Sequence, residues 1–112
     1  MNRKRIGNLG EAMAEVMLVE RGYQIIARNY RCRFGEVDII ARRGGVMAFI
    51  EVKTRLSRRY GDGAEAVTEA KQQRIRRCAE YYLSVNRWDY SSVDFQVIEI
   101  SALHLEGLDF AG

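Results

Sequence analysis

Two runs of β-forming residues flank a pair of glycines, and this feature limits the fold more than any other. Residues 35–43 and 46–54 are rich in Val, Ile and Phe, and only Gly44-Gly45 lies between them. Such runs are typical of strands, and a two-residue Gly-Gly connection is a strong signal for a β-hairpin. The sequence therefore predicts an antiparallel strand pair over residues 35–54.

A helix and a strand are expected before this hairpin. Residues 6–21 place apolar side chains at helical spacing, and Gly22 follows as a suitable helix stop. Residues 23–30, which contain Ile25 and Ile26, are typical of a strand. The helix residues expected to face the core are Ile6, Leu9, Met13, Val16 and Met17.

A loop, a long helix and a last strand are expected after the hairpin. The polar, basic residues 56–63 predict the loop, and residues 93–100 predict the strand. Residues 64–86 predict the helix, whose core stripe would consist of Val67, Ile75, Cys78, Ala79 and Tyr82. The order α-β-β-β-α-β predicts an α/β (α+β) fold, a mixed sheet flanked by helices, as one domain over residues 1–112.

The composition excludes several classes of protein. The chain has 112 residues, of which 47% are hydrophobic, so it can bury a core and is not intrinsically disordered. Two cysteines and one histidine exclude a disulfide framework and a zinc site of Cys and His, which needs about four ligands. Cys32 and Cys78 could pair only if the fold brings them together, and we expect two free thiols.

The distribution of charge points to a polyanionic partner. Residues 1–87 contain all 18 Lys and Arg residues but only 10 of the 15 acidic residues, which gives this part a formal charge of +8. A basic body of this kind most often binds nucleic acid. A solvated basic surface without a partner would have the same composition.

No segment is expected to enter a membrane or to direct export. No apolar run approaches the roughly 18–20 residues of a membrane span. The N-terminus is basic, but Gly7, Asn8 and Gly10 interrupt any apolar stretch of the kind that a signal peptide needs. We therefore expect a reduced protein in the cytoplasm.

The hairpin turn predicts which side chains share a face. With Gly44-Gly45 as the turn, the register places Asp38 opposite Glu51. It also places Glu36 opposite Lys53. Side chains two residues apart point to the same face, so these four polar groups would lie together. The apolar pairs expected on the opposite face are Ile39–Ile50 and Val37–Val52.

Two carboxylates that face each other need compensation. Asp38 and Glu51 would have Cβ atoms about 4.5–5.5 Å apart, and like charges directly opposite each other destabilise a sheet. Either one carboxyl group stays protonated or a cation lies between them. Mg²⁺ suits such a pair, because it binds one or two carboxylates, waters and phosphate oxygens. Lys53 would reach a phosphate or a metal-bound water, so the set is typical of metal-dependent phosphodiester hydrolysis.

A simpler interpretation needs no ligand. Asp38 and Glu51 would then splay into water on an exposed sheet face. Glu36 and Lys53 would form a surface ion pair, which contributes only about 0–1 kcal/mol. A one-residue slip of the register would also move the whole set to the other face. The residues alone leave these interpretations open.

Several motifs resemble a known protein family. Residues 35–41 (GEVDIIA) and 49–55 (FIEVKTR) resemble the D…ExK core of the restriction-endonuclease-like, or PD-(D/E)xK, superfamily. Within it, the chain is most similar to the bacterial YraN-type family, an uncharacterised endonuclease-like group. Further family marks are GNLGE at residues 7–11, RNYR at residues 28–31, and Lys71 and Arg74 in the second helix. The resemblance covers nearly the whole chain and implies the same α-β-β-β-α-β core.

The resemblance also implies roles for individual residues. Asp38 and Glu51 would be metal ligands together with the backbone carbonyl of Val52. Lys53 would orient or activate the attacking water or stabilise charge on phosphate. Glu11 would reach the metal from the first helix, directly or through water, or would serve only as an acid favoured by the helix dipole. The superfamily often has Pro before the Asp, where this chain has Val37; this position is tolerant.

Basic residues near these motifs are the expected nucleic-acid contacts. They are Arg55, Arg58 and Arg59, which follow the ExK strand, and Lys71 and Arg74 near the start of the long helix. A basic loop beside a metal site would track a phosphate backbone. A solvated face stabilised by ion pairs along the helix is the alternative.

The leading hypothesis is a Mg²⁺- or Mn²⁺-dependent nuclease that acts on nucleic acid, with DNA as the expected partner. Because the chain contains no sequence-reading module, we expect it to recognise nucleic-acid structure. One site cuts one strand, so cutting both strands would need a homodimer or two events. The alternatives are a nucleic-acid- or partner-binding module without catalysis and, with less support, a small nucleotide hydrolase.

Overall fold

The computed structural model describes residues 3–55 and 67–101, and it confirms the predicted order of elements. That order is α1 (Arg3–Glu20), β1 (Gln24–Cys32), β2 (Gly35–Arg43), β3 (Val46–Arg55), α2 (Glu69–Val85) and β4 (Ser92–Ser101). The helix predicted from residue 64 begins at Glu69, because the Thr68 hydroxyl caps it by accepting the Lys71 N–H at 3.2 Å. The predicted loop at 56–63 lies outside the described residues.

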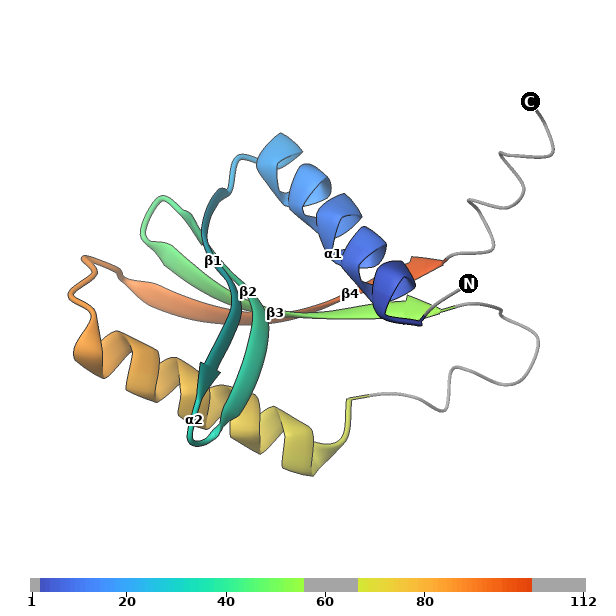
Figure 1. Ribbon diagram of the computed structural model, residues 1–112. Helices are drawn as coiled ribbons and strands as arrows, with labels where there is room; N and C mark the ends of the chain where they lie inside the picture. The colour runs from blue at the N-terminus through green and yellow to red at the C-terminus, as the bar shows by residue number, and fades with distance from the viewer. Residues whose placement is uncertain (1–2, 56–66, 102–112) are drawn as a thin grey trace, which may run out of the picture.

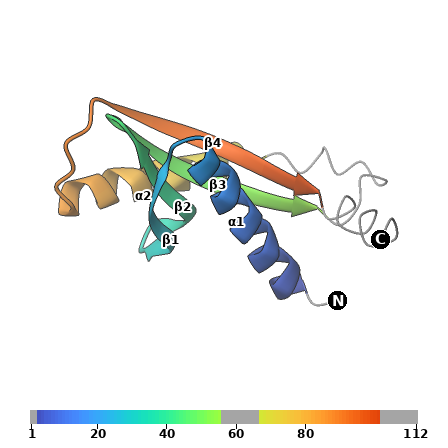
Figure 2. The same ribbon diagram turned by 90° about the horizontal axis from the view of Figure 1, so that it is seen from above.

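The four strands form one mixed sheet in the order β1-β2-β3-β4. β1, β2 and β3 are antiparallel neighbours, whereas β4 lies parallel to β3. A parallel neighbour requires a crossover connection, and α2 lies in that connection. Figure 1 shows α1 and α2 on opposite faces of the sheet, and Figure 2 shows the same arrangement from above. The result is the predicted α/β fold with a mixed sheet flanked by helices.

Each helix covers its own hydrophobic cluster. The stripe predicted for α2 is confirmed at Ile75, Cys78, Ala79 and Tyr82, which are buried against Val37, Ile40, Met47 and Phe49. On the α1 side, Ala14 and Leu18 are buried against Ile39, Ala41, Ala48 and Ile50. Neither helix in the described part of the chain is long and apolar enough to cross a membrane.

The predicted core stripe of α1 is partly wrong. Leu9 and Val16 are 46% and 60% exposed, whereas Ile6 is buried and Met17 packs partly against the core. The helix instead presents small residues, Gly10 and Ala14, to the sheet. Small side chains allow the helix to approach the strands closely, and Leu9 and Val16 lie away from this contact face.

Gly10 packs closely against Thr54 of β3, and Gly10→Ala is expected to destabilise the protein. A Cβ at Gly10 would lie 1.9 Å from Oγ1 of Thr54, so the helix or the strand must shift. We expect the free energy of unfolding to fall by about 1–3 kcal/mol, as for other overpacked cores, measured by chemical denaturation.

Gly7→Ala is the matched control for this substitution. A Cβ at Gly7 meets nothing within 4 Å, so the better helix former should stabilise the protein by up to about 1 kcal/mol. Equal effects of the two substitutions would show that helix propensity, and not the contact with Thr54, governs position 10.

Candidate catalytic site between β2 and β3

The candidate site lies where β2 and β3 separate. The predicted register is confirmed from Arg43–Val46 to Ile39–Ile50, which is the last ladder pair between these strands. Asp38 and Glu51 are therefore not a ladder pair, contrary to the prediction. The Asp38 side chain instead enters the gap, where its Oδ2 accepts the backbone N–H of Val52 at 2.8 Å. A carboxyl group thus takes the place of a backbone acceptor at the point of separation.

β2 follows β1 beyond this point, and its faces change accordingly. Val37 pairs with Tyr30 of β1 and packs in the α2 cluster, whereas Ile39 packs in the α1 cluster. Val52 packs against the α1 cluster, so the predicted Val37–Val52 contact is wrong. Strict alternation of side chains holds only while a strand keeps a regular partner, and β2 loses β3 as a partner here.

Asp38 has a strongly shifted pKa. Burial raises the pKa of this carboxyl group from 3.8 to about 7, although the Val52 N–H opposes the shift. The charges of Glu51 and Glu11 raise it further, as does a hydrogen bond between the Asp38 and Glu51 side chains. The hydrogen bond favours the protonated form of Asp38, which donates to Glu51. Below about pH 7 the two acids therefore lie together in the folded protein with a proton between them.

The shifted pKa predicts that stability falls as pH rises. Because the folded pKa of Asp38 lies above the unfolded value, the folded state holds the extra proton between about pH 4 and pH 7. Stability should decline across this range and be lowest above pH 7, where Asp38 is charged beside Glu51 and Glu11. After allowance for partial exposure, we expect a loss of about 1–2 kcal/mol, measured by denaturation at pH 5 and pH 8.

Asp38→Asn tests the cause of this pH dependence. The amide keeps an acceptor for Val52 and cannot ionise, so this variant should lose most of the decline and be more stable than wild type at pH 8. Parallel curves for the two proteins would assign the pH dependence to other groups.

Glu51 is buried and is paired with a lysine from α2. Its side chain is 7% exposed, and Lys71 Nζ lies 2.5 Å from its Oε2. Lys71 was expected to contact phosphate from an exposed helix face. Because α2 begins after Thr68, Lys71 lies in its first turn and faces Glu51 in the middle of β3. A cation of the chain itself therefore neutralises one of the two carboxylates.

Glu11 and Asn29 extend the site toward α1. Burial raises the pKa of Glu11, a hydrogen bond from the Asn29 side chain opposes this shift, and the charges of Glu36, Glu15 and Glu51 add to it. Asn29 was not predicted as a site residue. Its φ is 49°, a left-handed conformation that Asn adopts more readily than most residues. The RNYR motif was the one sequence signal that could have pointed to Asn29 as a site residue.

Lys53 and Glu36 are not opposite each other as predicted. Glu36 faces Arg31 of β1 in the register, and the two form an ion pair at 2.5 Å. Lys53 lies two residues beyond Glu51 on β3 and is partly exposed. In the part of the chain that the structure describes, the Lys53 ammonium group forms no ion pair. It is therefore available to a ligand at this end of the sheet.

A polar pocket opens over the two carboxyl groups. It has a volume of about 330 Å³, and Asp38 and Glu51 lie beside two cationic side chains in its lining. The remaining lining residues come from the β1–β2 turn region and α2; the full set is Gly35, Glu36, Asp38, Glu51, Lys71, Arg74 and Ile75. Two acids with cationic side chains beside them suit an anionic ligand that binds together with a metal ion.

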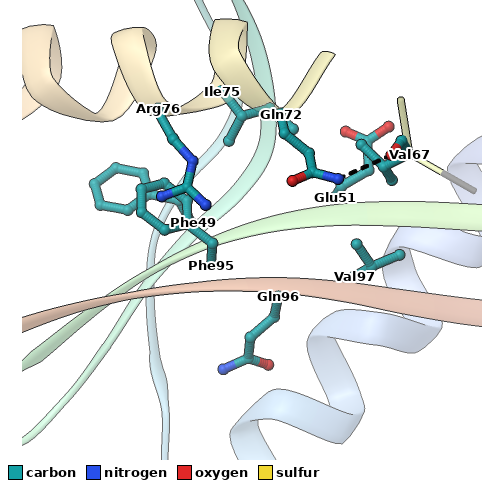
Figure 3. Close-up of a pocket in the computed structure, with 9 residues that line it drawn as sticks. All are labelled: Phe49, Glu51, Val67, Gln72, Ile75, Arg76, Phe95, Gln96 and Val97. Carbon is teal, nitrogen blue, oxygen red and sulfur yellow. Dashed lines mark hydrogen bonds between the residues drawn. The ribbon is translucent and has the colours of Figure 1, made fainter. Parts of the chain in front are cut away.

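A second, mainly apolar pocket of about 240 Å³ lies between α2 and strands β3 and β4 (Figure 3). Phe49 and Phe95 lie at one end of it, and the guanidinium of Arg76 lies 4.9 Å from the Phe95 ring centre. Glu51 lies at the other end near Val67. Glu51 and Ile75 line both pockets, so the two pockets adjoin at these residues.

The predicted basic contacts have different environments. Arg74 is exposed and lines the polar pocket. Arg55 is only 11% exposed, and its Nε lies 2.7 Å from the Glu99 carboxylate on β4. Arg58 and Arg59 lie outside the described residues. Of the predicted contacts, Lys71 and Arg74 are thus the ones that the structure brings to the carboxyl pair.

Oxygen donors suited to a divalent cation meet in the gap between β2 and β3. Asp38 and Glu51 supply carboxyl oxygens, and the Val52 carbonyl points toward β2 because its N–H does. Within residues 3–55 and 67–101, no three Asp, Glu, His or Cys side chains form a group that could hold a metal, so Glu11 does not complete one. This set fits Mg²⁺ or Mn²⁺, which binds few carboxylates and several waters, and does not fit structural zinc.

Comparison with known proteins identifies a family but not an activity. The sequence profile described as "Uncharacterised protein family UPF0102" matches residues 10–100. A UPF0102 protein of Symbiobacterium thermophilum is 50% identical over 97 residues, which cover 87% of this chain and 82% of that protein. One of Caldicellulosiruptor saccharolyticus is 43% identical over 100 residues, which cover 89% and 85%.

One solved structure, described as a repair endonuclease from Pyrococcus abyssi, overlaps 90% of this chain at 15% identity and a TM-score of 0.48. The overlap covers 47% of that structure, so this chain spans about half its length. The sequence relatives cover most of both chains, and they confirm the YraN-type resemblance drawn from the motifs. The chain therefore belongs to the uncharacterised protein family UPF0102.

Proposed function

We propose that this protein is a metal-dependent nuclease that hydrolyses phosphodiester bonds in nucleic acid, with DNA as its substrate. The observation that carries the proposal is the contact between the Asp38 and Glu51 carboxyl groups beneath a pocket lined by Lys71 and Arg74. A carboxyl group such as Asp38, whose pKa is raised by burial and a neighbouring charge beside a pocket, is a candidate functional group. The D…ExK residues and the order of elements support membership of the PD-(D/E)xK superfamily.

The proposed metal ligands are Asp38, Glu51 and the carbonyl of Val52, with Glu11 acting through water. A bound Mg²⁺ or Mn²⁺ would supply Lewis-acid polarisation of the phosphate and a more acidic water. A bound cation would offset the burial of Asp38 and the charge of Glu51, which together raise the pKa of Asp38. Val52 fixes the orientation of Asp38 through its N–H, so the acid does not need to reorganise.

Two side chains are proposed to act on the substrate. Lys53 lies on the strand that carries Glu51, and its ammonium group would orient the attacking water or stabilise charge on the phosphate oxygens. Arg74 is exposed at the pocket and would bind a phosphate with paired N–H groups. Under this proposal the acid pair, the lysine and the arginine would act together on one phosphodiester.

We propose that the Lys71 ammonium group binds the Glu51 carboxylate when no metal ion is bound there. Its ammonium group and a divalent cation compete for the same Glu51 carboxylate. Lys71→Met should therefore tighten Mn²⁺ binding roughly tenfold, equivalent to about 1.4 kcal/mol, measured by calorimetry without nucleic acid. Arg77→Met, which removes an exposed charge from the same helix, should leave the affinity unchanged. Weaker binding by Lys71→Met would assign Lys71 a supporting role in the metal site.

The substrate is proposed to be recognised by its structure and backbone. The formal charge of +8 over residues 1–87 favours binding to a phosphate backbone, and this attraction weakens with salt. Arg55 is paired with Glu99 and would therefore contribute less to nucleic-acid binding than Arg74. Arg58 and Arg59 are still proposed to contact the phosphate backbone. We propose that the protein acts in the cytoplasm, where DNA and RNA are accessible. A homodimer is the proposed route to cleavage of both strands.

The proposal is tested by cleavage of a labelled panel of nucleic acids. The panel contains duplex, single-stranded, nicked, flapped and four-way-junction DNA, and RNA, each with Mg²⁺, Mn²⁺ or EDTA. We expect metal-dependent cleavage of at least one structured DNA. Absence of cleavage under every condition, with binding that ignores EDTA, would contradict the nuclease.

A binding module without catalysis is the second candidate, and one observation favours it. Lys71 neutralises Glu51 and the Val52 N–H satisfies Asp38, so the acids have partners within the chain. Under this alternative, nucleic acid would bind in EDTA with unchanged affinity, and calorimetry would detect no Mn²⁺ binding. Mn²⁺ binding that Asp38→Asn abolishes would exclude it.

A further inference from the structure

The two cysteines, distant in sequence, lie against each other between the β1–β2 turn region and α2. Cys32 ends β1, Cys78 lies in the middle of α2, and their Sγ atoms are 3.2 Å apart. A disulfide requires an S–S distance near 2.05 Å, so the sulfurs need to approach by only about 1 Å. Both thiols are free in this structure, and the fold has brought them together.

The two thiols differ in access and in environment. Cys78 is fully buried, whereas Cys32 is partly exposed and its sulfur accepts the N–H of Phe34 at 3.4 Å. Burial, followed by the hydrogen bond and charge of Cys32, raises the pKa of Cys78 to about 12. A dissolved oxidant therefore meets Cys32 first, and Cys78 is placed to react with the product.

The segments that carry the thiols are also walls of the polar pocket. Gly35 follows Cys32 by three residues, and a Cβ there would lie 3.6 Å from the Cys78 sulfur and 3.5 Å from Cβ of Arg74. Gly35 and Glu36 line the pocket from the hairpin, and Lys71 and Arg74 line it from α2. A covalent link between Cys32 and Cys78 would fix the separation of these two walls.

We propose that Cys32 and Cys78 are a redox-modifiable pair that forms an intramolecular disulfide with a peroxide as oxidant. Cys32 first reacts with hydrogen peroxide to give its sulfenic acid and one water. The Cys78 sulfur then attacks the Cys32 sulfur, a second water leaves with the Cys78 proton, and the S–S bond forms. Two thiols lose two hydrogen atoms and the peroxide is reduced to two waters, so the step balances.

The inference is tested on the full chain with hydrogen peroxide, followed by quenching and mass spectrometry. We expect the loss of two hydrogen atoms and, after non-reducing digestion, one cross-linked peptide that contains Cys32 and Cys78. The disulfide closes a loop between residues 46 apart in sequence, so Tm should rise by about 5–15 °C and return with dithiothreitol.

Cys32→Ser is the control, because Cys32 is partly exposed at the edge of the α2 cluster, so its loss should disturb the core less than loss of the fully buried Cys78. Peroxide should leave the Tm of this variant unchanged. Addition of oxygen without a cross-link, a dimer linked through Cys32, or equal Tm responses of wild type and Cys32→Ser would each overturn the proposal. None of these readouts depends on nuclease activity.

Discussion

Asp38→Asn is expected to reduce metal-dependent cleavage at least about a thousandfold while nucleic-acid binding is retained. A thousandfold corresponds to about 4 kcal/mol of lost transition-state stabilisation. The amide oxygen still accepts the Val52 N–H, so the fold and the position of the side chain persist. The neutral amide is a poor ligand for a hard cation, so the metal site loses one of its two carboxylates.

The measurement is single-turnover cleavage at pH 8 with saturating Mg²⁺, together with binding by fluorescence anisotropy in EDTA. Asp94→Asn is the matched control, because Asp94 is an exposed acid on β4 that accepts a hydrogen bond from Gln96 on the same strand. Binding by Asp38→Asn should equal or exceed that of wild type, since a negative charge is removed. Wild-type cleavage by Asp38→Asn would disprove the proposed site.

Lys53→Ala is expected to lower cleavage about a hundredfold to a thousandfold with little change in metal affinity. Lys53 is proposed to act on the water or the phosphate and not on the metal, so its loss should affect the chemical step. The expected signature is a reduced single-turnover rate at saturating DNA and Mg²⁺, with Mn²⁺ binding within about twofold of wild type.

Lys71→Met provides the contrast within the same site. Lys71 contacts Glu51, whereas Lys53 forms no ion pair among the described residues. The two variants should therefore change different quantities: Lys71→Met the affinity for metal, and Lys53→Ala the rate at saturation. A change in Mn²⁺ affinity alone for Lys53→Ala would move Lys53 from a catalytic to an electrostatic role.

Much of the fold could be predicted because its signals are local. The Gly44-Gly45 turn fixed the register of β2 and β3 as far as Ile39–Ile50, and helical spacing identified the buried face of α2. The same reasoning misplaced Leu9 and Val16 in α1. The spacing of apolar residues does not show which face of a helix contacts the sheet most closely. In α1 a close contact with the sheet is made at Gly10, a residue that hydropathy does not mark as part of the core.

The candidate site was predicted in composition and not in geometry. Asp38 and Glu51 do meet, but through side chains across a gap and not as a pair in the ladder. The register predicted from the turn requires β2 and β3 to remain paired to their ends. β2 has two neighbours, and beyond Ile39 its pairing with β1 continues while that with β3 stops, a competition that no single hairpin reveals.

The sequence by itself determined the order of elements, the hairpin register, the acid and lysine set of the ExK strand, and the family. These features depend on residues within a few positions of one another, where turn chemistry and side-chain periodicity act. Only the tertiary structure decided that Lys71 meets Glu51, that Asn29 meets Glu11 and that Cys32 meets Cys78. Each of these contacts joins segments distant in sequence, and their positions depend on how both helices pack on the sheet, which no local pattern specifies.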